Sequence, residues 1–266
     1  MRNPIGVCLD RNPFPNVQSL VQAVSAAGFD QIEWFEPGEE APWSLPEVAE
    51  ELRRLMRRHE IVSRYHAPYE GRLDLAAGSG GLRAVEEVVE VLLECLARAE
   101  RLGARLMTLH LGSCPDESER GEALKRIAEG IRVSLPDLER RRIRLALENH
   151  TKAIIQSSLG DQPEDFDWLM ACLPAEWVGM TLDIGHAHIN GHMEEFLSRP
   201  FDRVWNMHLH DNKGSEDEHL PLGEGSIRWK EVLGRVASEG YEGPLTLEFT
   251  AEPPAYLAAL RMLRSL

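Results

Sequence analysis

Short apolar runs alternate with amphipathic stretches along the whole chain. Runs this short and this continuously apolar are typical of strands buried on both faces of a parallel sheet. Eight of them occur, at residues 5–9, 30–35, 61–66, 106–111, 144–149, 178–184, 204–210 and 244–249. The segments between them carry helical periodicity, which is clearest over residues 82–102, where apolar residues recur every three or four positions. The pattern therefore predicts eight strand–helix units in succession.

Eight such units predict a closed (β/α)8 TIM barrel, formed by residues 1–266 as a single domain. In an open doubly wound sheet, polar residues gather at one crevice, whereas here they follow almost every predicted strand. The longest irregular stretches, residues 67–81 and 211–227, follow the third and seventh strands. In a barrel, loops of this kind cover the face that carries the active site.

Charge and composition narrow the range of partners. The net charge is −15, from 44 acidic and 29 basic residues. This charge disfavours electrostatic binding to nucleic acid or to an anionic membrane. No run approaches the roughly 20 apolar residues of a membrane span, and residues 1–10 lack the apolar region of a signal peptide. We therefore expect a cytoplasmic protein. Its cysteines form no CxxC pair and are expected to be free thiols: Cys8, Cys95, Cys114 and Cys172.

Histidines and carboxylates lie at the ends of the predicted strands or in the turns just beyond them. A buried imidazole or carboxylate must be hydrogen-bonded or metal-bound, so such positions are costly without a partner. The C-terminal ends of barrel strands converge on one face, which makes these residues neighbours. Nine residues share this placement: His66, His110, Glu148, Asp183, His186, His208, Asp217, His219 and Glu248. Together they predict a metal site.

Four of the nine form the core of that prediction: Glu148, Asp183, His208 and Glu248. A site so rich in carboxylates suits Mn²⁺, Mg²⁺ or Co²⁺, and the nearby histidines shift the preference toward Zn²⁺ or Mn²⁺. The remaining five are candidates for further ions, with Glu148 as a bridge. Two alternatives stay open. His66 and His110 could orient the substrate instead of binding metal, and Asp217 with His219 could only stabilise the conformation of their loop.

Other polar and aromatic residues near strand ends are candidates for supporting roles. His150, His188 and His210 each follow a candidate ligand by two residues and are expected to orient it. Aromatic rings could wall a sugar-sized pocket, asparagines could position a hydroxyl, and lysines could meet an anionic substrate. The predicted substrate-binding residues are His66, His110, Tyr69, Trp34, Asn149 and Lys213, with Trp205, Asn212 and Lys152 as further candidates of the same kinds.

Several motifs resemble those of the xylose isomerase-like TIM barrel superfamily. This superfamily holds sugar phosphate isomerases and epimerases, inosose dehydratases, and endonuclease IV of AP endonuclease family 2. The resemblance spans nearly the whole chain, through HAPY at 66–69, LEN at 147–149, LDIGHAH at 182–188, HLHDNKG at 208–214, DEHLPLGEGSI at 217–227 and LEF at 247–249. It implies a barrel enzyme that uses a divalent metal, and relatives of this type often form homo-oligomers.

Similarity to the epimerase branch implies one ion held by the core group Glu148, Asp183, His208 and Glu248. The two glutamates would act as acid and base on a sugar or polyol, through a metal-stabilised enediolate. His186 would contact a substrate oxygen and counts as catalytic. Ketose 3-epimerases carry an Arg six residues after the metal-binding His, where this chain has Gly214. We therefore predict an isomerase or epimerase outside that subgroup.

Similarity to endonuclease IV implies a different reaction on the same ligands. That branch holds three zinc ions with nine ligands, all matched here in type, and cleaves abasic DNA. The surrounding motifs differ: this chain has residues 150–153 in place of Ala-Gly-Gln-Gly, Gly185 in place of a Cys, and Glu218 in place of an Arg. Phosphoester hydrolysis is therefore the alternative prediction. An inosose dehydratase-like lyase and a barrel that binds metal without turnover are further alternatives.

Overall fold

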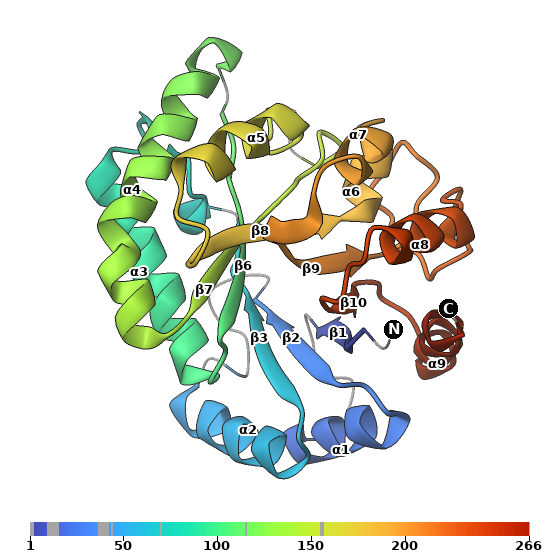
Figure 1. Ribbon diagram of the computed structural model, residues 1–266. Coiled ribbons are helices and arrows are strands. Elements are labelled where there is room, and N and C mark those ends of the chain that lie inside the picture. The colour runs from blue at the N-terminus through green and yellow to red at the C-terminus, as the bar shows by residue number, and fades with distance from the viewer. Residues whose placement is uncertain are drawn as a thin grey trace.

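A closed barrel of eight parallel strands, surrounded by helices, forms the centre of the molecule (Figure 1). The computed structural model describes residues 3–9, 16–36, 43, 45–69, 71–114, 116–154 and 157–265. The barrel strands are β1 (Ile5–Leu9), β2 (Gln31–Phe35), β3 (Val62–His66), β6 (Leu106–His110), β7 (Arg144–Glu148), β8 (Val178–Asp183), β9 (Val204–Leu209) and β10 (Leu245–Leu247). Each falls on a predicted apolar run, so the predicted (β/α)8 barrel is confirmed.

The barrel closes because β1 pairs with strands from both ends of the order. Ile5 lies opposite Leu245 of β10, and Gly6 lies opposite Gln31 of β2, all in parallel register. Parallel strands place all their C-terminal ends at one face of the barrel. Residues that are far apart in the sequence therefore meet there.

Helices follow the strands and pack against their outer faces (Figure 1). They are α1 (Val17–Ala27), α2 (Pro46–Arg58), α3 (Val85–Arg101), α4 (Arg120–Arg141), α5 (Pro163–Cys172), α6 (Ile184–Ile189), α7 (Met193–Leu197), α8 (Trp229–Ser238) and α9 (Pro253–Arg264). The predicted helix 82–102 is α3, which begins later because residue 82 pairs in the small hairpin of β4 (Ala77–Gly78) and β5 (Gly81–Leu82). Among the described residues, no helix combines the length and the apolar content that crossing a membrane requires.

The inside of the barrel contains a connected polar layer rather than only apolar side chains. Gln31 Nε2 donates to Thr246 Oγ1 at 2.9 Å, Thr246 Oγ1 donates to Asn206 Oδ1 at 2.8 Å, and Asn206 Nδ2 donates to Glu33 Oε2 at 2.9 Å. All four residues are buried. We call Gln31, Glu33, Asn206 and Thr246 the inner layer. Its hydrogen bonds offset the cost of burying polar groups and connect β2, β9 and β10.

Apolar side chains of the strands point outward and form the core with the helices. Ile32 and Trp34 of β2 are fully buried in this core, with Trp34 packed against Trp43 at a ring distance of 5.4 Å. The predicted free thiols are also confirmed, since none of the cysteines is in a disulfide: Cys8, Cys95, Cys114 and Cys172. The barrel therefore has an apolar shell around a polar interior, and that interior leads to the site.

Candidate metal centre

The predicted strand-end residues converge at the C-terminal mouth of the barrel. His66, His110, Glu148 and Asp183 are the last residues of β3, β6, β7 and β8, and Glu248 follows β10 directly. His208 is the next-to-last residue of β9, while the other candidates come from α6 and from the loop after β9. All nine predicted residues fall into groups whose ligand atoms lie within 4.8 Å of one another; three of these groups share residues and one is separate.

The central group consists of Glu148, Asp183, His208 and Glu248, as predicted. His208 Nδ1 lies 2.8 Å from Glu148 Oε1 and 2.8 Å from Glu248 Oε2. Three of the four residues are fully buried, and Glu248 is nearly so. Carboxylates brought this close in a buried site repel one another unless a cation or protons lie between them.

Glu148 also belongs to a neighbouring group with His66 and His110. Its Oε2 lies 3.0 Å from His66 Nε2 and 3.2 Å from His110 Nε2. Glu148 therefore presents one oxygen to the central group and the other to this pair. A carboxylate in this position could bridge two ions, and this role of Glu148 stays a prediction.

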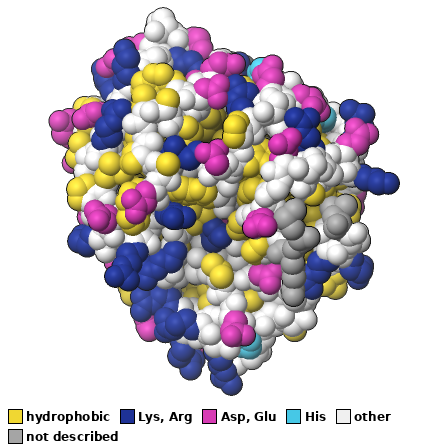
Figure 2. Space-filling model, viewed as in Figure 1, with side chains coloured by type: hydrophobic (Ala, Val, Ile, Leu, Met, Phe, Trp, Pro, Cys, Tyr) yellow, Lys and Arg dark blue, Asp and Glu magenta, His cyan; other side chains and the backbone are white. Residues whose placement is uncertain are grey.

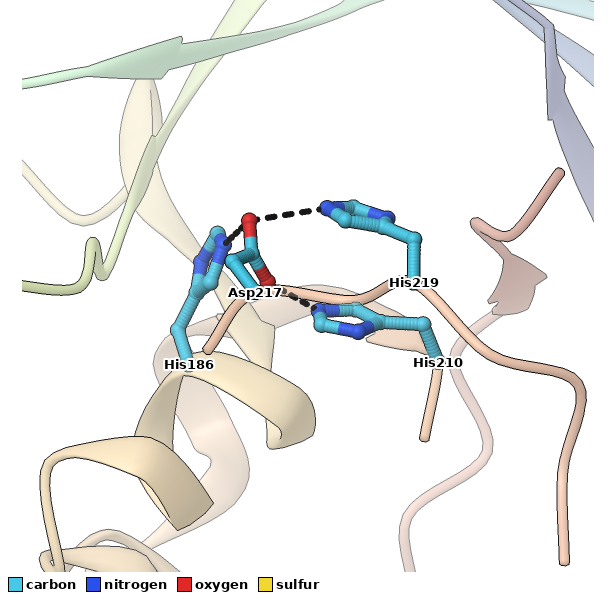
Figure 3. A group of neighbouring side chains, drawn as sticks. All are labelled: His186, His210, Asp217 and His219. Carbon is cyan, nitrogen blue, oxygen red and sulfur yellow. Dashed lines mark hydrogen bonds and ion pairs between the residues drawn. The ribbon is translucent and has the colours of Figure 1, made fainter. Parts of the chain in front are cut away.

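A separate group, which we call the loop group, consists of His186, His210, Asp217 and His219 (Figure 3). Asp217 lies between the three imidazoles: its Oδ2 is 3.0 Å from His219 Nε2 and 3.5 Å from His186 Nε2, and its Oδ1 is 3.6 Å from His210 Nε2. His210 was predicted only to orient a ligand. The structure places it among the candidate ligands instead.

Hydrogen bonds fix which ring nitrogen of three histidines is free to bind a cation. The Nδ1 atoms of His66, His186 and His219 lie 3.0, 2.9 and 2.6 Å from backbone carbonyl oxygens. A carbonyl can only accept, so each Nδ1 carries a proton, and Nε2 presents its lone pair to a carboxylate. Ligating histidines in proteins usually hold their outer nitrogen in this way.

Where the Nε2 atoms of these histidines meet carboxylate oxygens, two hydrogen-bond acceptors face each other. For His219, Nδ1 faces Glu248 O while Nε2 faces Asp217 Oδ2 at 3.0 Å, so the ring needs a second proton or a cation. Burial alone would lower the pKa of His219, but Asp217 outweighs it and raises the pKa to about 9. Without a metal, the ring holds a second proton at neutral pH. A divalent cation would replace that proton.

Unpaired polar atoms show that the centre fits a divalent ion. Several buried atoms lack a hydrogen-bond partner within the described ranges: Glu148 Oε2, Asp183 Oδ2, Glu248 Oε2, His186 Nε2, Asp217 Oδ1 and both ring nitrogens of His210. Leaving such groups unpaired in a protein interior is costly. Their mixture of carboxylate oxygens and imidazole nitrogens suits Mn²⁺ or Zn²⁺.

Comparison with known proteins agrees with this architecture. The family model for the xylose isomerase-like TIM barrel matches residues 21–266. The chain belongs to this family.

The relatives of this chain have diverse descriptions. An uncharacterised protein of Methanocaldococcus jannaschii is 27% identical over 88% of this chain and 79% of its own length. A D-tagatose 3-epimerase-like protein has a TM-score of 0.80 and 26% identity, over 98% of this chain and 96% of that chain. Endonuclease IV from Thermus thermophilus has a TM-score of 0.68 and 23% identity over 98% of both chains, a likeness in fold alone.

One further residue at the metal centre, Glu33, was not predicted from the sequence. Glu33, in β2, places Oε1 3.3 Å from His208 Nε2, the ring nitrogen that faces away from the central group. Burial would raise the pKa of Glu33, but His208 outweighs it and lowers the pKa to about 2. A carboxylate behind a ligating histidine fixes its orientation. The sequence did carry a signal for this residue, because Glu33 is a charged residue within the otherwise apolar run 30–35.

His150 differs from the candidate ligands in its tautomer. The backbone N–H of Thr151 donates to His150 Nδ1 at 2.8 Å, so the ring proton is on Nε2. Burial lowers the pKa of His150 to about 3, so the ring is neutral and cannot bind a metal through Nε2. The buried Nε2 has no partner among the residues described. His150 is therefore a hydrogen-bond donor at the site, and not the predicted support of a ligand.

The aromatic wall of the site differs from the prediction. Trp34 is fully buried between the barrel and its helices, and Trp205 lies at the opposite end of the barrel under the guanidinium of Arg144, 5.0 Å from the ring. Both were wrong as wall residues. Instead, Phe35 packs 4.6 Å from the ring of His66 and stacks on Tyr69, whose ring lies 4.8 Å from that of His110. Only Tyr69 was predicted.

Polar residues predicted to contact substrate have other partners. Both ends of the Asn149 amide bond the backbone of Asp183, at 2.7 and 2.8 Å, and the side chain is fully buried, so it holds β7 and β8 together. Lys213 is exposed and pairs with Glu218 at 2.9 Å. Lys152 pairs with Asp161 at 2.7 Å. A role in substrate binding stays a prediction for these residues.

Other predicted supporting residues also bond elsewhere. Asn212 Nδ2 donates to Gly185 O at 3.0 Å, and His188 Nε2 lies 2.8 Å from Ser226 Oγ. Both contacts join the loop after β9 to α6. These residues shape the loop around the mouth of the barrel.

Proposed function

We propose that this protein is a divalent-metal-dependent isomerase or epimerase of a sugar or polyol. The observation that carries the proposal is the placement of Glu148 and Glu248 on either side of His208, with an oxygen of each 2.8 Å from Nδ1. Two carboxylates at one buried site can remove a proton from carbon and return one to it. Similarity to a D-tagatose 3-epimerase-like structure at 26% identity supports the same class.

The central group would hold the ion, with Mn²⁺ or Zn²⁺ as the favoured metals and Mg²⁺ or Co²⁺ as others. When bound, the ion supplies positive charge that stabilises the negative charge developing on substrate oxygens as the C–H proton leaves. Burial would raise the pKa of Glu148, but His110 and His208 outweigh it and hold the pKa well below its usual range. Glu148 is therefore ionised and able to accept a proton.

Neighbouring residues would bind and orient the substrate. The Nε2–H of neutral His150 is fixed as a donor to a substrate oxygen. Phe35 and Tyr69, whose rings are stacked at 6.1 Å, offer an apolar surface to the C–H face of a sugar. The directions of Nε2 in His66, His110 and His186 favour cation binding over the predicted contacts of these rings with substrate.

Phosphoester hydrolysis is a second candidate, because the loop group and the His66–His110–Glu148 group provide ligands for more than one ion. Charge argues against a nucleic-acid substrate. The protein carries a net charge of −15. On the face seen in Figure 2, Asp and Glu lie among the Lys and Arg of the upper half, while Lys and Arg gather at the lower left. Duplex binding needs a continuous basic surface to neutralise phosphates.

Solvent-exchange measurements test the proposal. The metal-loaded protein is incubated in D2O with a panel of ketoses, ketose phosphates and inososes, and proton NMR follows deuterium uptake beside the carbonyl. We expect uptake on at least one compound, and a loss of at least about a thousandfold for Glu148→Gln and for Glu248→Gln, since each removes a catalytic acid–base group. Glu224→Gln, at an exposed glutamate of the loop, is the matched control and should retain activity.

Two results would count against the proposal. Near-normal exchange in Glu148→Gln or Glu248→Gln would remove the two-glutamate mechanism. Absence of exchange across the panel, together with cleavage of an abasic-site oligonucleotide, would establish hydrolysis in its place.

A further inference from the structure

A cavity lined by arginines lies at the N-terminal end of the barrel, opposite the metal centre. Its volume is about 870 Å³, and it is bordered by residues at the beginning of β3, β6, β7 and β9: Val62, Leu106, Arg144 and Val204. Binding sites for small molecules usually measure about 300 to 1,000 Å³. We propose that this cavity binds a small organic anion with at least two negative charges, such as a phosphate ester.

The charge of the cavity is opposite in sign to that of the whole protein, whose net charge is −15. Four guanidinium groups and one carboxylate line the cavity: Arg64, Arg105, Arg142, Arg144 and Glu139. A monovalent anion would leave most of this local positive charge uncompensated. The excess therefore favours a ligand with several negative charges.

None of these four arginines forms an ion pair with a carboxylate in the described part of the chain. Other arginines do, since Arg98 pairs with Glu36 at 2.7 Å and Arg141 pairs with Glu100. Arg64 is half-buried. A guanidinium that is partly removed from water without a counter-ion is unfavourable, and a bound anion would supply that counter-ion.

Trp205 holds one of the guanidinium groups in place. The guanidinium of Arg144 lies over the indole ring, 5.0 Å from its centre. The register of β8 with β9 shifts beside Trp205, which makes it the extra residue of a β-bulge, and bulges re-aim side chains. A Cβ atom at Gly179 would lie 2.4 Å from Trp205 Cδ2, so glycine leaves the room that the ring needs. The bulge and Gly179 therefore fix Arg144 at the cavity.

Two other arginines are each held by a single contact. Arg64 Nε donates to Gln31 Oε1, and Arg105 Nη1 donates to the carbonyl oxygen of Arg141 at 2.7 Å. Each guanidinium keeps further N–H groups, arranged in a planar fork that matches the oxygens of a phosphate or a carboxylate. Side chains that are fixed in advance lose less conformational entropy when a ligand binds.

Apolar side chains line the rest of the cavity, which favours an organic anion over an inorganic one. They are Val62, Leu106, Trp177, Val204 and Trp205. Val62 is unusual among apolar residues of the barrel strands, because 51% of its surface is exposed. The carbon part of a ligand would cover this surface while its charged groups meet the arginines.

Basic residues at the ends of neighbouring helices have a separate explanation. Positive charge stabilises the C-terminal end of a helix. The last turns of α2, α3 and α4 carry such residues: Arg57, Arg58, Arg98, Arg101, Arg140 and Arg141. Figure 2 shows Lys and Arg gathered at the lower left, over the region of α2 and α3 in Figure 1. Arg64 and Arg144 extend from strands, so the helix ends do not account for them.

Calorimetric titration tests the site. The full-length, metal-loaded protein is titrated with phenyl phosphate, succinate and benzoate at constant ionic strength. We expect saturable binding of phenyl phosphate or succinate, and weaker binding of benzoate, which has one negative charge. Affinity should fall about 10 to 100-fold in Arg142→Gln and in Arg144→Gln, since each removes hydrogen bonds to a charged group. Arg132→Gln, at an exposed arginine of α4 outside the cavity, is the matched control and should bind normally.

Three results would overturn the proposal. Equal affinity in Arg142→Gln, Arg144→Gln and the unchanged protein would mean that the anion binds elsewhere, for example at the metal centre. Absence of saturable binding of both dianions at millimolar concentrations would mean that water and salt suffice for these arginines. Equal binding of benzoate and phenyl phosphate would remove the requirement for several charges.

The comparison of the two dianions identifies the charged group of the ligand, because phosphate and carboxylate oxygens both fit a guanidinium fork. Circular dichroism checks that the variants fold. If Arg144→Gln does not fold, the exposed Arg142 carries the same test. Metal content should be unchanged in every variant, since the cavity and the metal centre lie at opposite ends of the barrel. Failure of this site is therefore distinguishable from failure of the proposed function.

Discussion

The inner layer and the mouth of the barrel are both buried and polar, but they differ in how their polar atoms are paired. In the inner layer, donors meet acceptors from Gln31 through Thr246 and Asn206 to Glu33. At the mouth, carboxylate oxygens face the lone pairs of imidazoles. The first arrangement is complete within the protein, whereas the second needs a cation. Burial of polar groups therefore marks a functional site only where their hydrogen bonding is incomplete.

Removing metal should affect the mouth most strongly. A ligand that binds only the folded state stabilises it by about 4 kcal/mol when its free concentration is a thousandfold above Kd. We therefore expect the thermal unfolding midpoint to fall by several degrees when Zn²⁺ is chelated. Scanning calorimetry with and without metal measures this, and equal midpoints in both states would mean that the facing acceptors are satisfied by protons alone.

Disrupting the inner layer should reduce stability without changing metal content. Asn206→Ala removes the amide that donates to Glu33 Oε2 and the oxygen that accepts from the Thr246 hydroxyl, which costs roughly 2 kcal/mol. Urea unfolding of the metal-free protein measures the loss, and the zinc count serves as its control. A variant with normal stability but fewer ions would show that the two regions are not separate.

Glu33 joins the two regions, and its replacement should show a mixed effect. Glu33→Gln keeps the bond to Asn206 but weakens the hold on His208, so the affinity of the central group for metal should fall about 10 to 100-fold. Competition with a zinc chelator gives the affinity. The same loss at the loop group would contradict the assignment, since the contact of Glu33 is with His208, which belongs to the central group.

A surface ion pair outside both regions should give the smallest change in stability when it is broken. Hydrogen bonds from Arg72 and then Arg98 lower the pKa of Glu94 to about 2. A depressed folded-state pKa contributes stability above the ordinary pKa, and this contribution is lost as the pH falls toward about 2. Glu94 is partly exposed, so Glu94→Gln should cost less than about 1 kcal/mol at pH 7 and nothing near pH 2. Urea unfolding at both pH values checks this.

The barrel and the residues at its mouth were predictable because each rests on local patterns. Apolar runs gave the strands, and polar residues at their ends gave Glu148, Asp183, His208 and Glu248. The side that a strand residue faces was harder to predict. Trp34 was chosen where Phe35 faces the site, because adjacent strand residues point to opposite faces and an apolar run carries no sign of which face is inside.

Contacts that depend on the closed barrel could not be predicted from spacing. His210 was expected to orient a neighbour, but its ring fills the space left by the missing side chain of Gly185, and its place in the loop group also depends on the path of the loop after β9. The tautomer of His150 depends on a single backbone N–H, that of Thr151. Both features come from the three-dimensional course of the chain after a strand ends.

The central claim is that the facing acceptors at the mouth hold a divalent cation. Crystals grown with Zn²⁺ and measured on both sides of the zinc absorption edge test it most directly. We predict an anomalous difference peak between Glu148, Asp183, His208 and Glu248. A map without a peak at the central group, from protein saturated with zinc, would contradict it.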